Sequence, residues 1–186
     1  MSKFEFRVKA PSRTYNGVAL SDYRKYKPSL VKDFNEKCGY TDCHHSWFGG
    51  RSNFQIDHFK SKSKYPLLEK IYSNLVYSCS YVNRAKSNDD GNYLDPCNVN
   101  YNEHFHRDEF GNIHPNSDSE SAKYQHKKLK LYLKRYGIIW TLQQLEDRLS
   151  VLRTLIEKTG NAEAIDLYLK IDFKFHDYLK YLRAEQ

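Results

Sequence analysis

Two adjacent polar residues close a short, mostly apolar run in the first third of the chain. Asp57 and His58 end the segment FQIDH. A carboxylate is a ligand for hard divalent cations, and a neutral imidazole can take a proton from a water molecule. The pair could equally be two polar residues at the end of a strand. Its meaning therefore depends on the residues that the fold brings next to it.

Two asparagines and a lysine follow this pair at informative positions. Asn74 opens the segment NLVYSCSY, and Asn83 lies further on, with Lys86 one helical turn beyond it. The sequence patterns predict a strand over NFQIDHF, a strand over NLVYSCSY and a short helix over VNRAKSN. The end of the first strand and the start of the helix can then lie together. Asp57 and Asn83 would offer two oxygen ligands to one cation, with His58 beside it.

This combination resembles the HNH nuclease family, whose fold is the ββα-metal core. The family pattern of His, Asn and then His or Asn reads here as His58, Asn74 and Asn83. The similarity is closest at the Asn-x-x-Lys ending and covers roughly residues 36–90. It implies an α+β fold, with a small ββα-metal (HNH) core and a mainly helical C-terminal extension.

The resemblance also implies a reaction and a cofactor. His58 would deprotonate a water that attacks the scissile phosphorus, and Mg²⁺ or Mn²⁺ held by Asp57 and Asn83 would stabilise the leaving oxygen. Asn74 would brace the loop that carries His58, through hydrogen bonds to its backbone. Each residue has a plainer interpretation: a hydrogen-bonded strand end for His58, a turn residue for Asn74 and a helix cap for Asn83.

The cysteines raise the question of a structural zinc ion. Many HNH proteins brace this core with two Cys-x-x-Cys pairs, but Thr41 and Val82 stand here where the second members would be. Tetrahedral zinc needs four ligands. Either a rearranged zinc site exists or hydrophobic packing replaces it, and we favour the second interpretation. The candidate zinc ligands are Cys38, Cys43 and Cys79, with Cys97 or His44 as the fourth.

The charge of the chain is compatible with a nucleic-acid partner. A basic surface favours phosphate contacts, but a net charge of +7 over 186 residues, taken alone, slightly favours an ordinary basic protein. Lys60, Lys62 and Lys64 follow the Asp-His pair, and with Lys86 they are the predicted phosphate contacts. Such contacts position a strand without reading its sequence. We expect DNA, cleaved without strong sequence preference.

A looser similarity concerns the rest of the chain. HNH nucleases of bacterial anti-phage systems, including those paired with an ATPase, share an Asp-Pro after the core, here Asp95-Pro96, and a helical C-terminal part. This similarity implies a defence role and a regulatory ATPase as a further partner. Asp95 would buttress the core or cap a turn. The alternative function is a non-catalytic module that binds nucleic acid or docks a partner.

The remaining patterns define two parts. Residues 1–118 would form the nuclease core with an Asn/Asp-rich insert that holds short strands at 93–96 and around 111–115. Residues 119–186 would form helices packed on that core. We expect one helix over 119–137, a second that begins at a capping box at Thr141 and ends at Gly160, and a third capped by Asn161. The sequence has no 18-residue apolar stretch, so we expect a cytoplasmic protein without a membrane partner.

Overall fold

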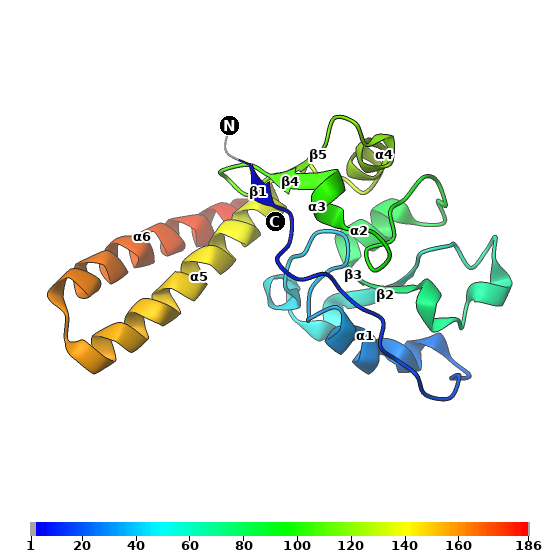
Figure 1. Cartoon of the computed structure of the whole chain (residues 1–186), viewed down its shortest axis with the longest axis horizontal. Coiled ribbons are helices and arrows are strands. Elements are labelled where there is room, and N and C mark those ends of the chain that lie inside the picture. Colours follow the sequence, from blue (N-terminus) through cyan, green and yellow to red (C-terminus); the bar gives the residue numbers. More distant parts are fainter. Residues whose placement is uncertain (1–2, 186) are drawn as a thin grey trace.

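The computed structural model describes residues 3–185 and shows an α+β protein (Figure 1). A strand–strand–helix unit lies near the middle of the sequence. Strand β2 (Phe54–His58) pairs antiparallel with β3 (Leu75–Cys79), and helix α2 (Ser80–Lys86) follows directly. The helix packs against both strands, so the predicted order of these three elements is confirmed. Helix α1 (Lys27–Asp33) contacts β3.

A second small sheet joins the start of the chain to the Asn/Asp-rich segment. Its strand order is β1 (Phe4–Glu5), β4 (Phe105–Arg107) and β5 (Ile113–Pro115), all antiparallel. Helix α3 (Tyr101–His104) leads into β4. The strand predicted around 111–115 is confirmed as β5. The strand predicted at 93–96 is wrong, because that segment runs without regular structure between turns.

The C-terminal part consists of α4 (Glu120–Lys128), α5 (Lys134–Thr159) and α6 (Ala162–Ala184). The single helix predicted over 119–137 is wrong, because Lys130 adopts a left-handed φ of 54° and breaks it. Thr141 does not begin a helix either: it lies inside α5 and donates a hydrogen bond to the Phe110 carbonyl. Gly160, at φ 61°, ends α5, and the Asn161 side chain caps α6, as predicted.

One hydrophobic core connects the two predicted parts of the chain. The first turns of α5 bury Tyr136, Ile139 and Leu142 in the same cluster as Leu75 and Val76 of β3. The distal halves of α5 and α6 project away from this body as an antiparallel pair (Figure 1). Residue 119 is therefore the start of a packed helical part and not a break in the core.

Short 3-10 turns connect the regular elements. They are η1 (Tyr23–Tyr26), η2 (His45–Phe48), η3 (Arg51–Asn53), η4 (Pro66–Leu68) and η5 (Tyr72–Asn74). Within residues 3–185, no helix has both the length and the hydropathy of a membrane span.

Candidate active site

Three of the four predicted catalytic residues line one small pocket, and Asn74 lies outside its lining. Asp57 and His58 reach it from the end of β2, and Asn83 reaches it from α2. The pocket has a volume of about 250 Å³. Its other lining residues are Tyr23, Ile56, Ser61, Lys62, Ser87 and Asn88.

Asp57 and His58 reach this pocket although they are neighbours on a regular strand. The pairing of β2 with β3 continues through His58 opposite Leu75, so successive side chains point to opposite faces. Asp57 accordingly contacts Tyr40 and Lys86. His58 instead contacts the Glu69 carbonyl and the ring of Tyr23. Both residues nevertheless belong to the lining of the same pocket.

His58 is held in one orientation and one tautomer. Its Nε2 lies 2.9 Å from the carbonyl oxygen of Glu69, an acceptor, so Nε2 carries the proton and Nδ1 has the free lone pair. The ring of Tyr23 packs edge-on against the imidazole at 4.7 Å. Burial lowers the pKa of His58 below its ordinary value, and the nearby Lys62 ammonium acts in the same direction. The imidazole is therefore neutral near pH 7.

Asp57 is the centre of a buried hydrogen-bond network. The Tyr40 hydroxyl donates to Oδ2 at 2.6 Å, and the Lys86 ammonium donates to Oδ1 at 3.1 Å. The same ammonium donates to the carbonyl oxygen of His58 at 2.7 Å. Burial raises the pKa of Asp57, while the Lys86 charge and the Tyr40 hydrogen bond oppose that shift.

The predicted role of Lys86 as a phosphate contact is corrected by this network. The side chain of Lys86 is fully buried and lies against the ring of Tyr93. An ammonium that has no exposed surface cannot meet a phosphate on the outside of the protein. Lys86 instead ties α2 to the end of β2.

Asn74 braces the segment after His58. Its Oδ1 accepts a hydrogen bond from the amide of Lys60 at 2.8 Å, and its Nδ2 donates to the carbonyl oxygens of Lys60 at 3.0 Å and Leu68 at 3.2 Å. The amide of Phe59 also donates to the Asn74 carbonyl. These bonds give Asn74 the loop contact that the family resemblance implies.

Asn83 and Asp57 have the oxygen chemistry that a hard cation requires. The Nδ2 of Asn83 donates to Gln55 Oε1, which leaves Asn83 Oδ1 as the group available to a cation. Each oxygen of Asp57 accepts one hydrogen bond in the structure, and a carboxylate has about four acceptor positions in all. Carboxylate and amide oxygens suit Mg²⁺ and Mn²⁺. By ligand type the two groups therefore match such an ion, although the Asp57 side chain is only 4% exposed and both of its oxygens already have protein donors.

The three lysines after the Asp-His pair have different surroundings. Lys60 is half-buried against the rings of Phe59 and Tyr65. Lys62 is exposed, lines the pocket and lies 3.5 Å from Glu69. Lys64 is exposed and paired with Asp90. Lys62 is thus the lysine best placed to contact a phosphate at the pocket.

The segment that carries Tyr40 is pressed closely against β3. A Cβ on Gly39 would lie 2.8 Å from Val76 Cγ1, so only glycine allows this approach. The Gly39 amide donates to the Tyr77 carbonyl, and Arg7 donates to the Gly39 carbonyl at 2.6 Å. This close packing positions the Tyr40 hydroxyl beneath Asp57.

Asp95 both buttresses the core and caps a turn. Arg13 makes hydrogen bonds to the two oxygens of Asp95 at 3.0 and 3.1 Å and also donates to the carbonyl of Leu75. The amide of Cys97 donates to Asp95 Oδ1 at 2.9 Å. The N-terminal segment is thereby tied to the start of β3.

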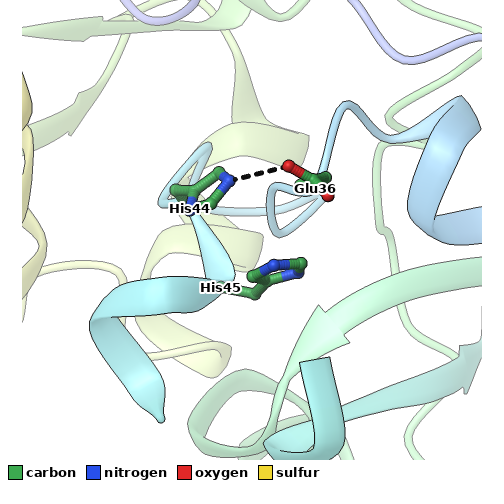
Figure 2. A group of neighbouring side chains, drawn as sticks. All are labelled: Glu36, His44 and His45. Atoms are coloured by element: carbon green, nitrogen blue, oxygen red, sulfur yellow. Dashed lines mark hydrogen bonds and ion pairs between the residues drawn. The ribbon is translucent and has the colours of Figure 1, made fainter. Parts of the chain in front are cut away.

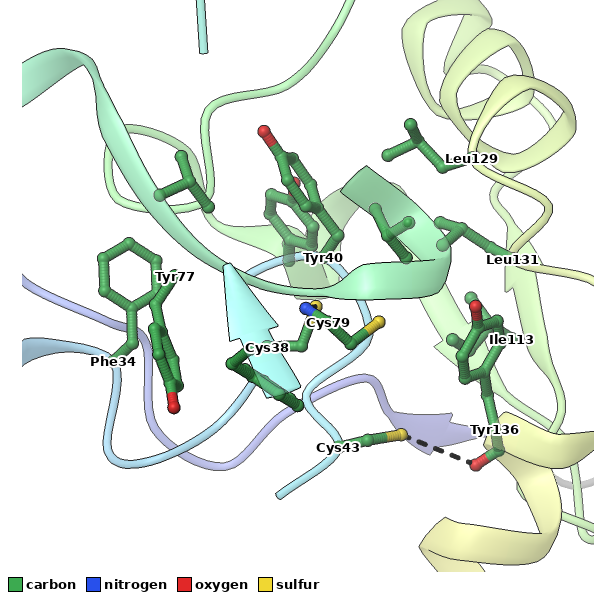
Figure 3. Packing of buried hydrophobic residues seen from close by; sticks show 14 of the residues in the cluster. Phe34, Cys38, Tyr40, Cys43, Tyr77, Cys79, Ile113, Leu129, Leu131 and Tyr136 are labelled. Atoms are coloured by element: carbon green, nitrogen blue, oxygen red, sulfur yellow. Dashed lines mark hydrogen bonds between the residues drawn. The ribbon is translucent and has the colours of Figure 1, made fainter. Parts of the chain in front are cut away.

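The four cysteines do not form one ligand set. Among the described residues, no three of their sulfurs lie within 4.8 Å of one another. The amide of Cys79 donates to Cys38 Sγ at 3.4 Å, while Cys43 turns towards the Tyr136 carbonyl (Figure 3). Burial alone would raise the pKa of Cys38, but hydrogen bonds from Cys79 and Thr41 lower it to about 6.

A different group of side chains has the spacing of a metal site. One nitrogen each of His44 and His45 and one oxygen of Glu36 lie within 4.8 Å of one another (Figure 2). Ser46 holds Nδ1 of His44, whose Nε2 lies 3.2 Å from Glu36. Tyr77 holds Nδ1 of His45. These partners orient both imidazoles, as the outer contacts of metal-binding histidines do.

Sequence reasoning missed several residues that shape the site. They are Tyr23, Tyr40, Gln55 and the carbonyl group of Glu69. Their signals were weak because each is a single polar or aromatic residue outside the motif pattern.

The chain was also compared with family models, curated proteins and solved structures, and none of them matches it.

Proposed function

We propose that this chain is a metal-dependent HNH-type endonuclease that hydrolyses phosphodiester bonds in DNA. The observation that best supports this function is the convergence of Asp57, His58 and Asn83 on one pocket. They converge from a strand–strand–helix unit, which is the element order of the ββα-metal core. As a DNA nuclease, the protein would act in the cytoplasm, in a defence role.

His58 would perform the proton transfer. Its neutral imidazole has the proton on Nε2, so Nδ1 accepts the proton of a water molecule as that water attacks phosphorus. Asn74 fixes the segment that follows His58, and the Tyr23 ring restricts the imidazole from one side. The general base is therefore held before substrate arrives, which lowers the cost of reaching the reactive geometry.

The substrate would be positioned by charge at the edge of the pocket. Lys62 is exposed there and would contact a phosphate next to the scissile one. Mg²⁺ or Mn²⁺, bound by Asp57 and Asn83, would supply the Lewis acid that stabilises negative charge on the leaving oxygen. The products would carry a 5′ phosphate and a 3′ hydroxyl.

A plasmid assay tests this function directly. Supercoiled DNA is incubated with Mg²⁺ or Mn²⁺ and wild-type protein, alone or with an ATPase partner, and His58→Ala is the matched variant. We expect metal-dependent nicking by the wild type only. Absence of nicking by the wild type under all these conditions would refute the endonuclease, and nicking that survives His58→Ala would refute His58 as the base.

The partner-docking alternative has support from the helical pair. The projecting parts of α5 and α6 expose large apolar side chains, a pattern associated with protein contacts. Such a surface is compatible with cleavage elsewhere on the molecule, so docking and catalysis can coexist. The exposed residues include Val151, Leu155, Leu167, Leu169 and Phe173.

A further inference from the structure

A second pocket, next to the candidate active site, has two arginines and no acidic residue in its lining. It has a volume of about 520 Å³. All of its lining residues belong to the described part of the chain. They are Trp47, Phe48, Gly49, Ser52, Asn53, Gln55, Ser80, Tyr81, Arg84 and Arg135.

Arg135 is the unusual member of this pocket. It is 6% exposed, yet its Nε has no hydrogen-bond partner among residues 3–185. The guanidinium stacks on the ring of Tyr81 at 4.0 Å and lies 5.5 Å from the ring of Phe48. Stacking fixes the plane of the guanidinium but gives Nε no acceptor. A buried N–H donor without a protein acceptor calls for a bound water or an anion, and the second arginine in the same lining favours an anion.

Arg84 places a second guanidinium at the same pocket. It is exposed on α2, its Nε reaches back to the Ser80 carbonyl at 3.3 Å, and it lies 5.4 Å from the ring of Tyr81. Tyr81 is thus contacted by both arginines. Guanidinium groups bind phosphate oxygens through paired N–H donors, which makes such a pair suited to a phosphate group.

A larger pocket, with a volume of about 660 Å³, is a poorer candidate for the same ligand. Its lining holds Arg7, Lys37 and His44, but it also holds four carboxylates that would repel a phosphate backbone. These carboxylates belong to Glu5, Asp42, Glu146 and Asp147. The arginine pocket has no Asp or Glu in its lining, and this distinguishes it from the larger pocket.

The arginine pocket adjoins the candidate active site through one side-chain pair. Gln55 lines the arginine pocket, and its Oε1 accepts a hydrogen bond from Asn83, which lines the pocket of His58. Arg84 and Asn83 are neighbours on α2. A strand bound at His58 can therefore continue over the Gln55–Asn83 pair into the arginine pocket.

We infer that Arg135 and Arg84 form a phosphate subsite for the DNA strand that is cut at His58. This inference rests on the proposed nuclease function for its substrate. It assigns a binding role to the first turn of α5, which brings Arg135 to the strand–strand–helix unit. The subsite holds a phosphate of the same strand, beyond the scissile position, and does not take part in the chemistry.

The affinity for a DNA oligonucleotide tests the subsite. It is measured by fluorescence anisotropy at several salt concentrations, without divalent metal. The proteins are wild type, Arg135→Gln, Arg84→Gln and, as a control, Arg153→Gln on the projecting part of α5. Loss of one phosphate contact reduces the slope of log K against log salt by about 0.7–0.9. We expect that reduction for Arg135→Gln and Arg84→Gln, and an unchanged slope for Arg153→Gln.

Further measurements separate the subsite from a structural role and from the nuclease itself. Arg135→Lys keeps the charge and is expected to keep the slope, and thermal melts identify variants that do not fold. Unchanged slopes in folded Arg84→Gln and Arg135→Gln would overturn the subsite, even if the wild type cleaves DNA. Reduced slopes in both variants would support the subsite even if the wild type binds DNA without cutting it, an outcome that refutes only the nuclease.

Discussion

The buried ammonium of Lys86 lies 3.1 Å from the carboxylate of Asp57 and 2.7 Å from the carbonyl oxygen of His58. One side chain of α2 thus holds two consecutive residues at the end of β2. The contact places positive charge where the proposed metal ligand lies, so Asp57 is charge-balanced in the protein alone. A divalent ion at Asp57 would be bound next to Lys86, and its affinity would be lower than for an uncompensated carboxylate.

Replacement of Lys86 is expected to destabilise the protein strongly. Lys86→Met leaves the Asp57 carboxylate buried with only the Tyr40 hydroxyl, and loss of one member of a buried pair costs about 3–5 kcal/mol. Urea unfolding measures the change. Lys64→Met, at an exposed pair with Asp90, is the control and should leave the midpoint unchanged. Equal midpoints for the two variants would contradict the importance of the buried contact.

The hydroxyl of Tyr40 is expected to contribute separately. Tyr40→Phe removes a 2.6 Å hydrogen bond to a buried carboxylate, and hydrogen bonds to charged groups contribute about 1.5–3 kcal/mol. Tyr132→Phe is the matched control, because Tyr132 is exposed. Unfolding in urea compares them. If Tyr40→Phe is as stable as the control variant, the hydroxyl does not stabilise Asp57.

Asn74 is expected to act as a positioning residue. Asn74→Asp keeps the acceptor for the Lys60 amide but loses the two hydrogen bonds that Nδ2 donates to carbonyl oxygens. We expect a lower kcat, by about 10²-fold, with KM little changed, because the base is displaced and substrate contacts are not. A changed KM with an unchanged kcat would instead assign Asn74 to substrate binding.

The sequence alone predicted the elements of the site but not its internal contacts. Alternation in FQIDH and the Asn-x-x-Lys spacing located β2, β3 and α2, because these signals are local. The burial of Lys86 was not predictable, since it depends on Tyr93 and on the end of β2 meeting α2 in space. The break of the helix at Lys130 was missed for a similar reason. The helical spacing of the leucines continues across Lys130 and does not indicate its left-handed φ.

The Glu36, His44 and His45 group gives a prediction about transition metals. Imidazole and carboxylate ligands bind Co²⁺ and Zn²⁺, whereas no three cysteine sulfurs of the described residues lie within 4.8 Å of one another. Cobalt titration should therefore give d–d bands without a thiolate charge-transfer band. His44→Gln should weaken cobalt binding, and His114→Gln, an exposed histidine paired with Asp108, should not. A thiolate band in the folded wild type would contradict this assignment.

The lowered pKa of His58 predicts the direction in which cleavage rate and stability change with pH. The base must be neutral, so cleavage rises with pH, and the midpoint of this rise should lie below about 6.5, the ordinary value for histidine. The free energy of unfolding changes with pH in the same direction. The unfolded chain has the higher His58 pKa and binds this proton more readily than the folded chain. Stability therefore decreases as the pH falls from the ordinary histidine pKa towards the lowered pKa of the folded chain. Single-turnover rates at saturating magnesium and urea midpoints, each measured against pH, test both effects. His58→Ala should lose about 10²–10⁴-fold in rate and should remove this part of the pH dependence of unfolding. A cleavage midpoint above the ordinary histidine value would show that burial does not control the base.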